Sequence, residues 1–441
     1  MKRLNLLLIN AFLCLFVTIN VQAQQELTLN EFVEIALEQN YSIRIMENHE
    51  RIAGNNFSLG NAELLPSLSM RSSFAGNLNN SDQSYSDGSE AGLRSIHNTT
   101  ANMGLQANWM LFDGFRGQLR YKQLSELKDL SEINTRVSIE NMVAQLASEY
   151  YFYIQQKQQF NNLQYAVDLS RERVRIEEEH FLLGSGSKVQ LLQAQVNLNA
   201  DSSRLERQYE VLRASQIRLG EIIVAEDLAS ASVPADTSIN VNPDLAYDEL
   251  LNQSLNQNAN ILSAKQNLTI SEYDLDMTRS QRYPYLSMNT GYGYTHNTYQ
   301  SGSMTDQQTW GMNYSLTLGV NIYDGRNQHR RQSNARIDME NKNLILERTV
   351  QEVTADLITI YNAYTNHLRI LDLETQNLEV ARENLDIAFE RYRLGALSGF
   401  ELREVQKNLL EAEERLLSIQ YQAKMAEISL MQIAGRILEC K

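Results

Sequence analysis

Two stretches of 68 residues, 115–182 and 326–393, contain no proline, and their only glycine lies at the start of the first. Apolar residues recur there at helical spacing, as Leu127, Leu130, Ile133 and Val137 do. A helix of this length would measure roughly 100 Å, which is far more than the thickness of a bilayer. Because charged residues occur throughout, we predict two long helices that stand in water and pack in coiled-coil-like pairs.

The long helices belong to two similar halves of the chain. Leu27-Thr-Leu-Asn-Glu31 matches Leu245-Ala-Tyr-Asp-Glu249, and Phe112-Asp-Gly114 matches Tyr323-Asp-Gly325. Each half reads as a helix, a β-hairpin, the long helix, a tight turn and a return helix. The first helices are expected over 28–63 and 247–279, and the return helices over 188–223 and 398–433. We predict a first structural repeat over 24–225, a linker over 226–244 and a second repeat over 245–441.

The predicted hairpins, 67–111 and 285–322, alternate apolar residues with small polar ones. Four strands of about 11 residues fit the length of a tilted membrane-spanning strand, and aromatic residues such as Trp109 and Tyr285 lie near the strand ends. A soluble β-sandwich would show the same alternation. We favour membrane strands because the strands come in two hairpins, separated by long helices that could not complete a sandwich.

Four strands cannot close a membrane sheet, because edge strands in hydrocarbon would leave backbone groups unpaired. Bacterial barrels have at least eight strands, so two or more chains must share one barrel. Three chains would supply twelve strands, and the long helices would continue them as a tube. The fold class expected is therefore an α+β membrane protein that acts as an oligomer.

Residues 1–23 have a basic start, an apolar core and a small-residue cleavage site, which is typical of a secretory signal peptide. An uncleaved anchor helix is the alternative, although no cluster of charges follows it. Cleavage would remove Cys14 and leave Cys440 as the remaining cysteine, so no intrachain disulfide is expected. The net charge of −15 argues against nucleic acid as a partner.

No catalytic arrangement emerges from the sequence. The six histidines lack the spacing of metal ligands, and the glycine pairs lack the pattern of a nucleotide-binding loop. We therefore expect no enzyme activity, no cofactor and no metal site.

The motifs together resemble the TolC family of outer-membrane efflux proteins. The resemblance rests on Leu-Phe-Asp-Gly after a strand, the proline-led hairpins, the repeat and the turn around Leu394-Gly395. It implies a homotrimer in the outer-membrane lipid, with a twelve-stranded β-barrel continuous with a long periplasmic α-helical barrel. It also implies a passive exit duct, for efflux or type I secretion, that an inner-membrane transporter drives through a periplasmic adaptor (membrane fusion) protein.

The resemblance also implies site residues. The adaptor-docking tips would be Leu183, Gly184, Ser187, Leu394, Gly395 and Ser398, although these glycines could serve only as helix caps. The strand–helix junctions would be Pro66, Asp113, Gly114, Pro284, Asp324 and Gly325.

Glu401 and Glu404 would form a pore constriction that selects cations. The alternative is a solvated charged face beside Arg403 and Lys407. The same positions in the first repeat are Gln190 and Gln193, and Leu397 replaces a basic residue that helps to lock the tip of a family member.

Two other functions remain open at this point. An outer-membrane tether or adhesin stalk could use the helices as a spacer, but it would not need two matched glycine turns. A diffusion porin is disfavoured because porins place nearly all their residues in strands.

Overall fold

The computed structural model describes residues 26–439, so the predicted signal peptide, Cys14 and Cys440 lie outside the described residues. The described chain forms two compact units. The helical unit comprises 26–45, 136–258 and 352–439, and the strand unit comprises 46–135 and 259–351. Both units draw on both halves of the sequence.

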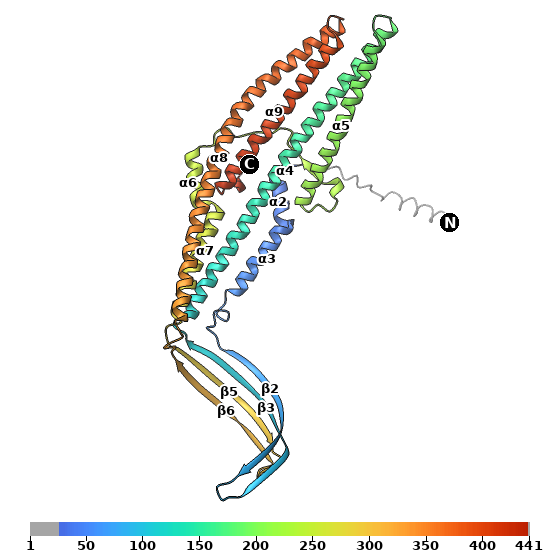
Figure 1. Cartoon of the computed structure of the whole chain (residues 1–441). Helices are drawn as coiled ribbons and strands as arrows, with labels where there is room; N and C mark the ends of the chain where they lie inside the picture. Colours follow the sequence, from blue (N-terminus) through green and yellow to red (C-terminus); the bar gives the residue numbers. More distant parts are fainter. Residues whose placement is uncertain (1–25, 440–441) are drawn as a thin grey trace, which may run out of the picture. The chain divides into compact units, whose positions relative to one another are not determined.

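Two helical hairpins make up most of the helical unit (Figure 1). Helix α4 (Arg116–Leu182) turns back into α5 (Lys188–Ile222), and α8 (Asn327–Arg393) turns back into α9 (Gly399–Ile433). The first turns of α4 and α8 belong to the strand unit. No helix of the described chain is long and apolar enough to cross a membrane.

The core of the helical unit lies where the shorter elements meet α4. Phe32 of α2 (Leu29–Gln39) is fully buried and meets Tyr150 of α4 edge to face, with 5.7 Å between ring centroids. Strand β1 (Glu26–Leu27) pairs with β4 (Val233–Pro234), and two 3-10 turns complete this region, η2 (Leu228–Ser230) and η3 (Ile437–Glu439). In the second half, α6 (Tyr247–Gln257) packs through Leu250 against Leu357 and Leu430.

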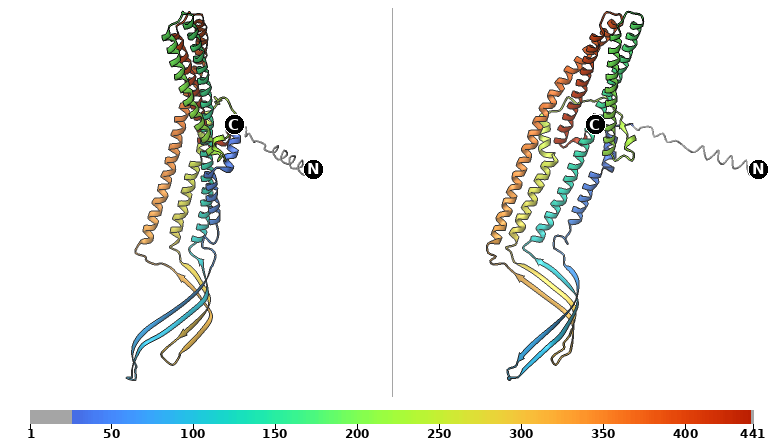
Figure 2. Two further views of the ribbon diagram at one scale, coloured as in Figure 1. Left: turned by 90° about the vertical axis from the view of Figure 1, so that its right-hand side faces the viewer. Right: turned by 45° about the vertical axis from the view of Figure 1, so that its right-hand side comes forward.

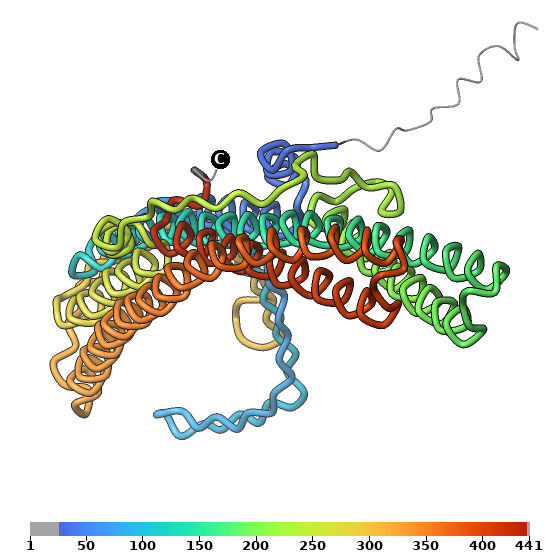
Figure 3. The backbone as a smooth tube through the Cα atoms, turned by 90° about the horizontal axis from the view of Figure 1, so that it is seen from above, coloured from blue at the N-terminus to red at the C-terminus, as the bar shows by residue number. Residues whose placement is uncertain are grey.

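The strand unit contains one antiparallel sheet in the order β2-β3-β5-β6. Its strands are β2 (Ser67–Ser84), β3 (Glu90–Phe112), β5 (Tyr285–Thr298) and β6 (Asp306–Gly319). The β2–β3 hairpin reaches further than β5–β6 (Figure 2) and bends along its length (Figure 3). Helices α3 (Tyr41–Asn56) and α7 (Ala259–Ser280) precede the two hairpins, and Phe57 stacks on Tyr121 of α4 with ring centroids 4.6 Å apart.

The expected strand length of about 11 residues was wrong. The four strands have 18, 23, 14 and 14 residues, because backbone pairing in the first hairpin continues through the polar stretch that leads to Ser84 and Glu90. Strand β6, in contrast, ends at Gly319 rather than Ile322. Gly319 pairs with Tyr285, and the next position of the neighbouring strand is Pro284, which has no N–H to donate.

The single first helix expected in each half was also wrong, because an asparagine divides it in two. Asn40 separates α2 from α3, and Asn258 separates α6 from α7, with ψ values of 126° and 121° that end each helix. The Asn40 amide donates to the Ile222 carbonyl at the end of α5 (2.9 Å), and the Asn258 amide donates to Ile433 at the end of α9 (3.0 Å). Each break therefore satisfies a carbonyl that a helix end leaves unpaired.

Replacing Asn40 by alanine should lower the free energy of unfolding by about 1–2 kcal/mol, since the change removes a helix cap and a hydrogen bond to Ile222. Asn258→Ala should have a similar effect in the second half. Thermal unfolding followed by circular dichroism measures both, with the exposed Asn55→Ala of α3 as the control. Equal melting temperatures for Asn40→Ala and Asn55→Ala would contradict a capping role.

Candidate functional site

The turn between α4 and α5 has the geometry of a helix C-cap followed by a capping box. Gly184 adopts φ +71°, a conformation that favours glycine, and its N–H donates to the Phe181 carbonyl (3.1 Å). Ser187 begins the return helix: its hydroxyl accepts from the Gln190 N–H (3.2 Å), and the Gln190 side chain accepts from the Ser187 N–H (2.8 Å). Leu183, beside the glycine, is 81% exposed.

The turn between α8 and α9 repeats this arrangement. Gly395 has φ +73° and donates to the Tyr392 carbonyl (3.0 Å), while Leu394 is again 81% exposed. Ser398 caps α9, and Glu401 completes the capping box by accepting from the Ser398 N–H (3.0 Å) and hydroxyl (2.8 Å). The structure thus gives all of these residues helix-end geometry, which does not by itself assign them a partner.

Glu401 and Glu404 both lie exposed on the first turns of α9. Hydrogen bonds from the Ser398 backbone and side chain hold the pKa of Glu401 below its usual value, so this carboxylate stays charged. Glu401 therefore contributes to the helix cap in addition to carrying a negative charge. Gln190 fills the same place in the first turn without a charge.

A buried polar network, which sequence reasoning missed, joins the two helical hairpins near these turns. Arg173 of α4 donates to Gln406 (3.0 Å) and to the Gly399 carbonyl of α9 (3.0 Å). The Tyr392 hydroxyl of α8 donates to Glu177 of α4 (2.6 Å), and burial together with this contact raises the pKa of Tyr392. Polar residues at core positions of helices are the only signal in the sequence for such a network.

An ion pair joins Arg403, the neighbour of Glu404, to the first helical hairpin. Its guanidinium meets both carboxylate oxygens of Asp201 on α5, at 2.6 and 2.8 Å. The Asp201 side chain is 1% exposed and also accepts from the Ser170 hydroxyl of α4 (2.7 Å). Arg403 thus binds α9 to the first hairpin, whereas Lys407 remains exposed and pairs with Glu411 (3.6 Å).

The two strand–helix junctions share one construction. Pro66 and Pro284 directly precede β2 and β5. On the return side, Asp113 accepts from the Gly117 N–H (2.9 Å) and Asp324 from the Gln328 N–H (2.8 Å), so each aspartate caps a long helix.

The glycines after these aspartates, Gly114 and Gly325, have φ of +73° and +68°. A Cβ on Gly114 would lie 2.5 Å from the Ser280 carbonyl oxygen, so the chain can pass there only as glycine.

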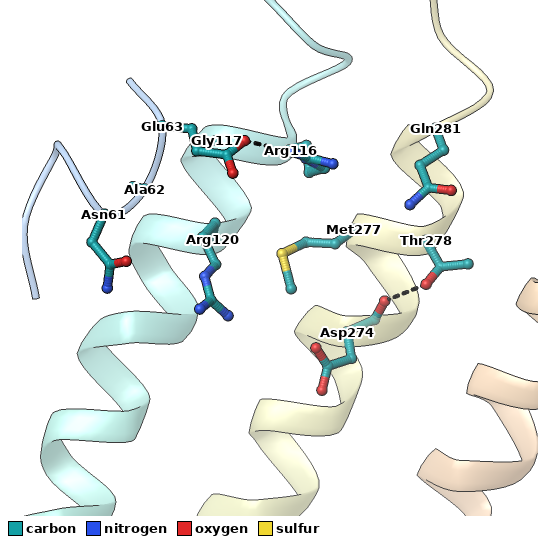
Figure 4. Close-up of a pocket in the computed structure, with 10 residues that line it drawn as sticks. All are labelled: Asn61, Ala62, Glu63, Arg116, Gly117, Arg120, Asp274, Met277, Thr278 and Gln281. Atoms are coloured by element: carbon teal, nitrogen blue, oxygen red, sulfur yellow. Dashed lines mark hydrogen bonds and ion pairs between the residues drawn. The ribbon is translucent and has the colours of Figure 1, made fainter. Parts of the chain in front are cut away.

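A cavity of about 420 Å³ lies beside the first junction, between the start of α4 and the end of α7 (Figure 4). Arg116, Arg120 and Asp274 line it, and Arg116 pairs with Glu63 (2.5 Å) while Asp274 accepts from Gln123 (2.6 Å). Each of these groups thus already has a partner within the chain, and we assign the cavity no ligand. Over the residues described, no three acidic, histidine or cysteine side chains are placed to hold a metal.

The sheet has one apolar face that is exposed in the single chain. Met70, Leu105, Tyr292 and Met312 lie in one row across the four strands, and each is at least half exposed. The opposite face carries mainly serine, asparagine, threonine and glycine, together with Arg71 of β2. In the described chain, β2 and β6 are each paired on one side only. Such a sheet is suited to lipid on one face and water on the other.

Solved structures share this fold at low sequence identity. A membrane protein from Pseudomonas aeruginosa aligns with a TM-score of 0.77 and 18% identity, covering 93% of this chain and 91% of the other. The MtrE outer membrane channel of Neisseria gonorrhoeae, in its open state, aligns with a TM-score of 0.72 and 18% identity, and the alignment covers 93% of this chain and 89% of the channel. The outer membrane protein VceC from Vibrio cholerae aligns with a TM-score of 0.72 and 15% identity, and the alignment covers 92% of this chain and 96% of VceC.

No curated protein matches the chain in sequence. The family model for "Outer membrane efflux protein", however, matches residues 32–222 and 250–436, which is most of both halves. The resemblance to TolC-type proteins and the α+β fold expected from the sequence are thereby confirmed. The chain belongs to the outer membrane efflux protein family, and it is a TolC-like protein of the bacterial outer membrane that extends into the periplasm.

Proposed function

We propose that three copies of this chain form a passive exit duct of a tripartite efflux or type I secretion system. An inner-membrane transporter supplies the energy and a periplasmic adaptor joins it to the duct. The chain itself carries out no chemical reaction and needs no cofactor. Membership of the efflux family and the outer membrane channels among the solved relatives support this proposal.

The observation that carries the proposal is the open four-stranded sheet. Strands β2 and β6 each present a row of backbone groups that no strand of the described chain pairs with. In hydrocarbon each unpaired group costs several kcal/mol, so further copies of the chain must continue the sheet at its two edges. Two copies would bring eight strands and three would bring twelve, and both numbers occur in outer-membrane barrels. The resemblance to TolC-type proteins favours three.

The two faces of the sheet support an aqueous duct. The row that contains Met70 and Met312 is apolar across all four strands and would face lipid. The small polar side chains of the other face would line a water-filled interior. The long helices leave the sheet at the capped junctions, where Asp113 and Asp324 fix their starts.

The two matched turns are where we place the adaptor. Leu183 and Leu394 are exposed beside glycines of positive φ, and Phe400 on the first turn of α9 is equally exposed at 81%. Exposed apolar side chains on rigid, capped turns suit a protein partner. A tether or adhesin stalk is the runner-up function, but it gives no reason for two such turns.

The purified mature protein should run as a trimer in mild detergent and conduct ions in a planar bilayer. Gel filtration with light scattering measures the first property, and single-channel recording measures the second. A monomer in detergent would contradict the shared barrel. Two results together would favour the tether. The trimer would be stable but would not conduct, and deleting the gene would change neither toxin resistance nor secretion.

Gly395→Pro should abolish transport while trimers still form. Proline cannot adopt φ +73° and lacks the N–H that donates to Tyr392, so the change disrupts the turn alone. The readout is restoration of the resistance or secretion that is lost when the gene is deleted. Gly395→Asn is the matched control, because asparagine tolerates this conformation. Full restoration by the proline variant would exclude adaptor docking at this turn.

Glu401→Gln combined with Glu404→Gln should reduce the cation preference of the pore, because three chains would lose six carboxylates. Glutamine is chosen over alanine since Gln190 completes the same capping box in the first turn, so the fold is kept. The reversal potential in a salt gradient measures the preference. The converse change at the equivalent exposed residues of the first repeat, Gln190→Glu with Gln193→Glu, should raise the cation preference. An unaltered potential in the first variant would remove these glutamates from the selectivity of the pore.

A further inference from the structure

The parts of the strands nearest the helices carry a single fixed charge, because the other charged residues of the strands lie towards the hairpin turns. In the segments 67–79, 98–112, 285–298 and 307–319, Arg71 is the only lysine, arginine, aspartate or glutamate. It lies on β2 with the parity of Ser69 and Ser73, which is the polar face, and opposite in direction to Met70 and Phe74. Its side chain is exposed in the single chain.

The pairing register gives Arg71 unusual surroundings. Arg71 pairs with Gly104 of β3, Gly104 with Gly293 of β5, and Gly293 with Gly311 of β6. The row that crosses the sheet at this level therefore has one side chain, that of Arg71. A Cβ on Gly104 would lie 3.0 Å from the Tyr292 carbonyl oxygen, so the close approach of the strands favours glycine there.

The residues around Arg71 do not neutralise it. Its neighbours two positions away are hydroxyls that bond within the sheet: Ser69 donates to the Gln106 carbonyl (3.4 Å), and Ser73 accepts from Asn102 (3.5 Å). Nearer the hairpin turns, Arg94 pairs with Asp82 (2.9 Å) and His296 with Asp306. Within the described residues, Arg71 has no acidic side chain in ion-pair distance.

We propose that Arg71 makes a positively charged belt in the strand-lined section of the duct and that this belt favours anionic solutes. The inference rests on the proposed function, in which the polar face lines a water-filled interior. Three copies then place three guanidinium groups at one level, with glycine around the rest of the ring. Rings of arginine in a low-dielectric wall attract anions and repel cations, and no acid of the wall offsets them here. A guanidinium on the lipid-facing side would be costly, which agrees with the parity of Arg71.

A thiol reporter tests the belt without requiring that the helical end of the duct be open. Ser73→Cys places a thiol two residues from Arg71 on the same face, in a chain whose Cys440 is changed to alanine. Intact cells are treated from outside with methanethiosulfonate reagents of opposite charge, ethylsulfonate and ethyltrimethylammonium. The measured quantity is the ratio of the anionic to the cationic reaction rate. The same ratio at Ser86→Cys, in the hairpin turn after β2, is the reference.

The ratio at Ser73→Cys should exceed the reference and should fall by roughly threefold to tenfold in Arg71→Gln, while Arg71→Lys keeps it. An identical ratio with arginine and glutamine at position 71 overturns the charged belt and leaves the duct intact. If neither reagent reaches Ser73→Cys while both modify Ser86→Cys, the polar face is not open to water. That result overturns the proposed duct, and the belt with it.

Discussion

The backbone hydrogen bonds of the sheet are the constraint on which the rest of the structure depends. Strands in hydrocarbon must pair every N–H and C=O. In the described chain β5 and the 99–108 part of β3 have strands on both sides, whereas one side of β2 and of β6 is open. This explains why the prolines that lead the hairpins, Pro66 and Pro284, stand just outside the ladder. In the proposed assembly it also makes oligomerisation part of folding, because a single copy would expose two unpaired edges. The exposed apolar row from Met70 to Met312 is removed from water only when lipid covers that face of the sheet.

The helical unit solves a different problem, since its long helices lie in water and could slide past one another. Apolar packing alone tolerates a shift of one turn, because leucines and alanines recur along each helix. The buried polar contacts do not tolerate such a shift. Arg173 donates to both Gln406 and the Gly399 carbonyl, and Arg403 donates to both carboxylate oxygens of Asp201. A shift would leave these groups buried without partners, at a cost of several kcal/mol. The network therefore fixes the register between the first and second hairpins close to the turns proposed for the adaptor.

Much of the fold could be predicted because its signals are local. The long stretches without proline and almost without glycine, the alternation in the hairpins and the glycine turns all lie within or next to the elements they define. What escaped prediction depends on distant partners. Asn40 ends a helix because its side-chain amide donates to the Ile222 carbonyl, and no residue near Asn40 in the sequence indicates this contact. Arg403 reads as a surface charge until Asp201, 202 positions away, is placed against it. The strands exceed the predicted length because pairing persists after the apolar pattern ends.

The two capping boxes separate what the fold requires at the turns from what a pore could use. Ser187 with Gln190 and Ser398 with Glu401 make the same pair of hydrogen bonds, so the box itself needs only an acceptor at its fourth position. The hydrogen bonds of the box do not need the negative charge of Glu401, although the bonds from Ser398 lower the pKa of this carboxylate. Glu404 is exposed and has no part in the box. Acid at both positions in the second turn, against glutamine at both in the first, is an asymmetry that the hydrogen bonds of the capping box do not require. The helix dipole favours a negative charge at Glu401 in the first turn, and selection of ions by a ring of carboxylates would account for Glu404 as well.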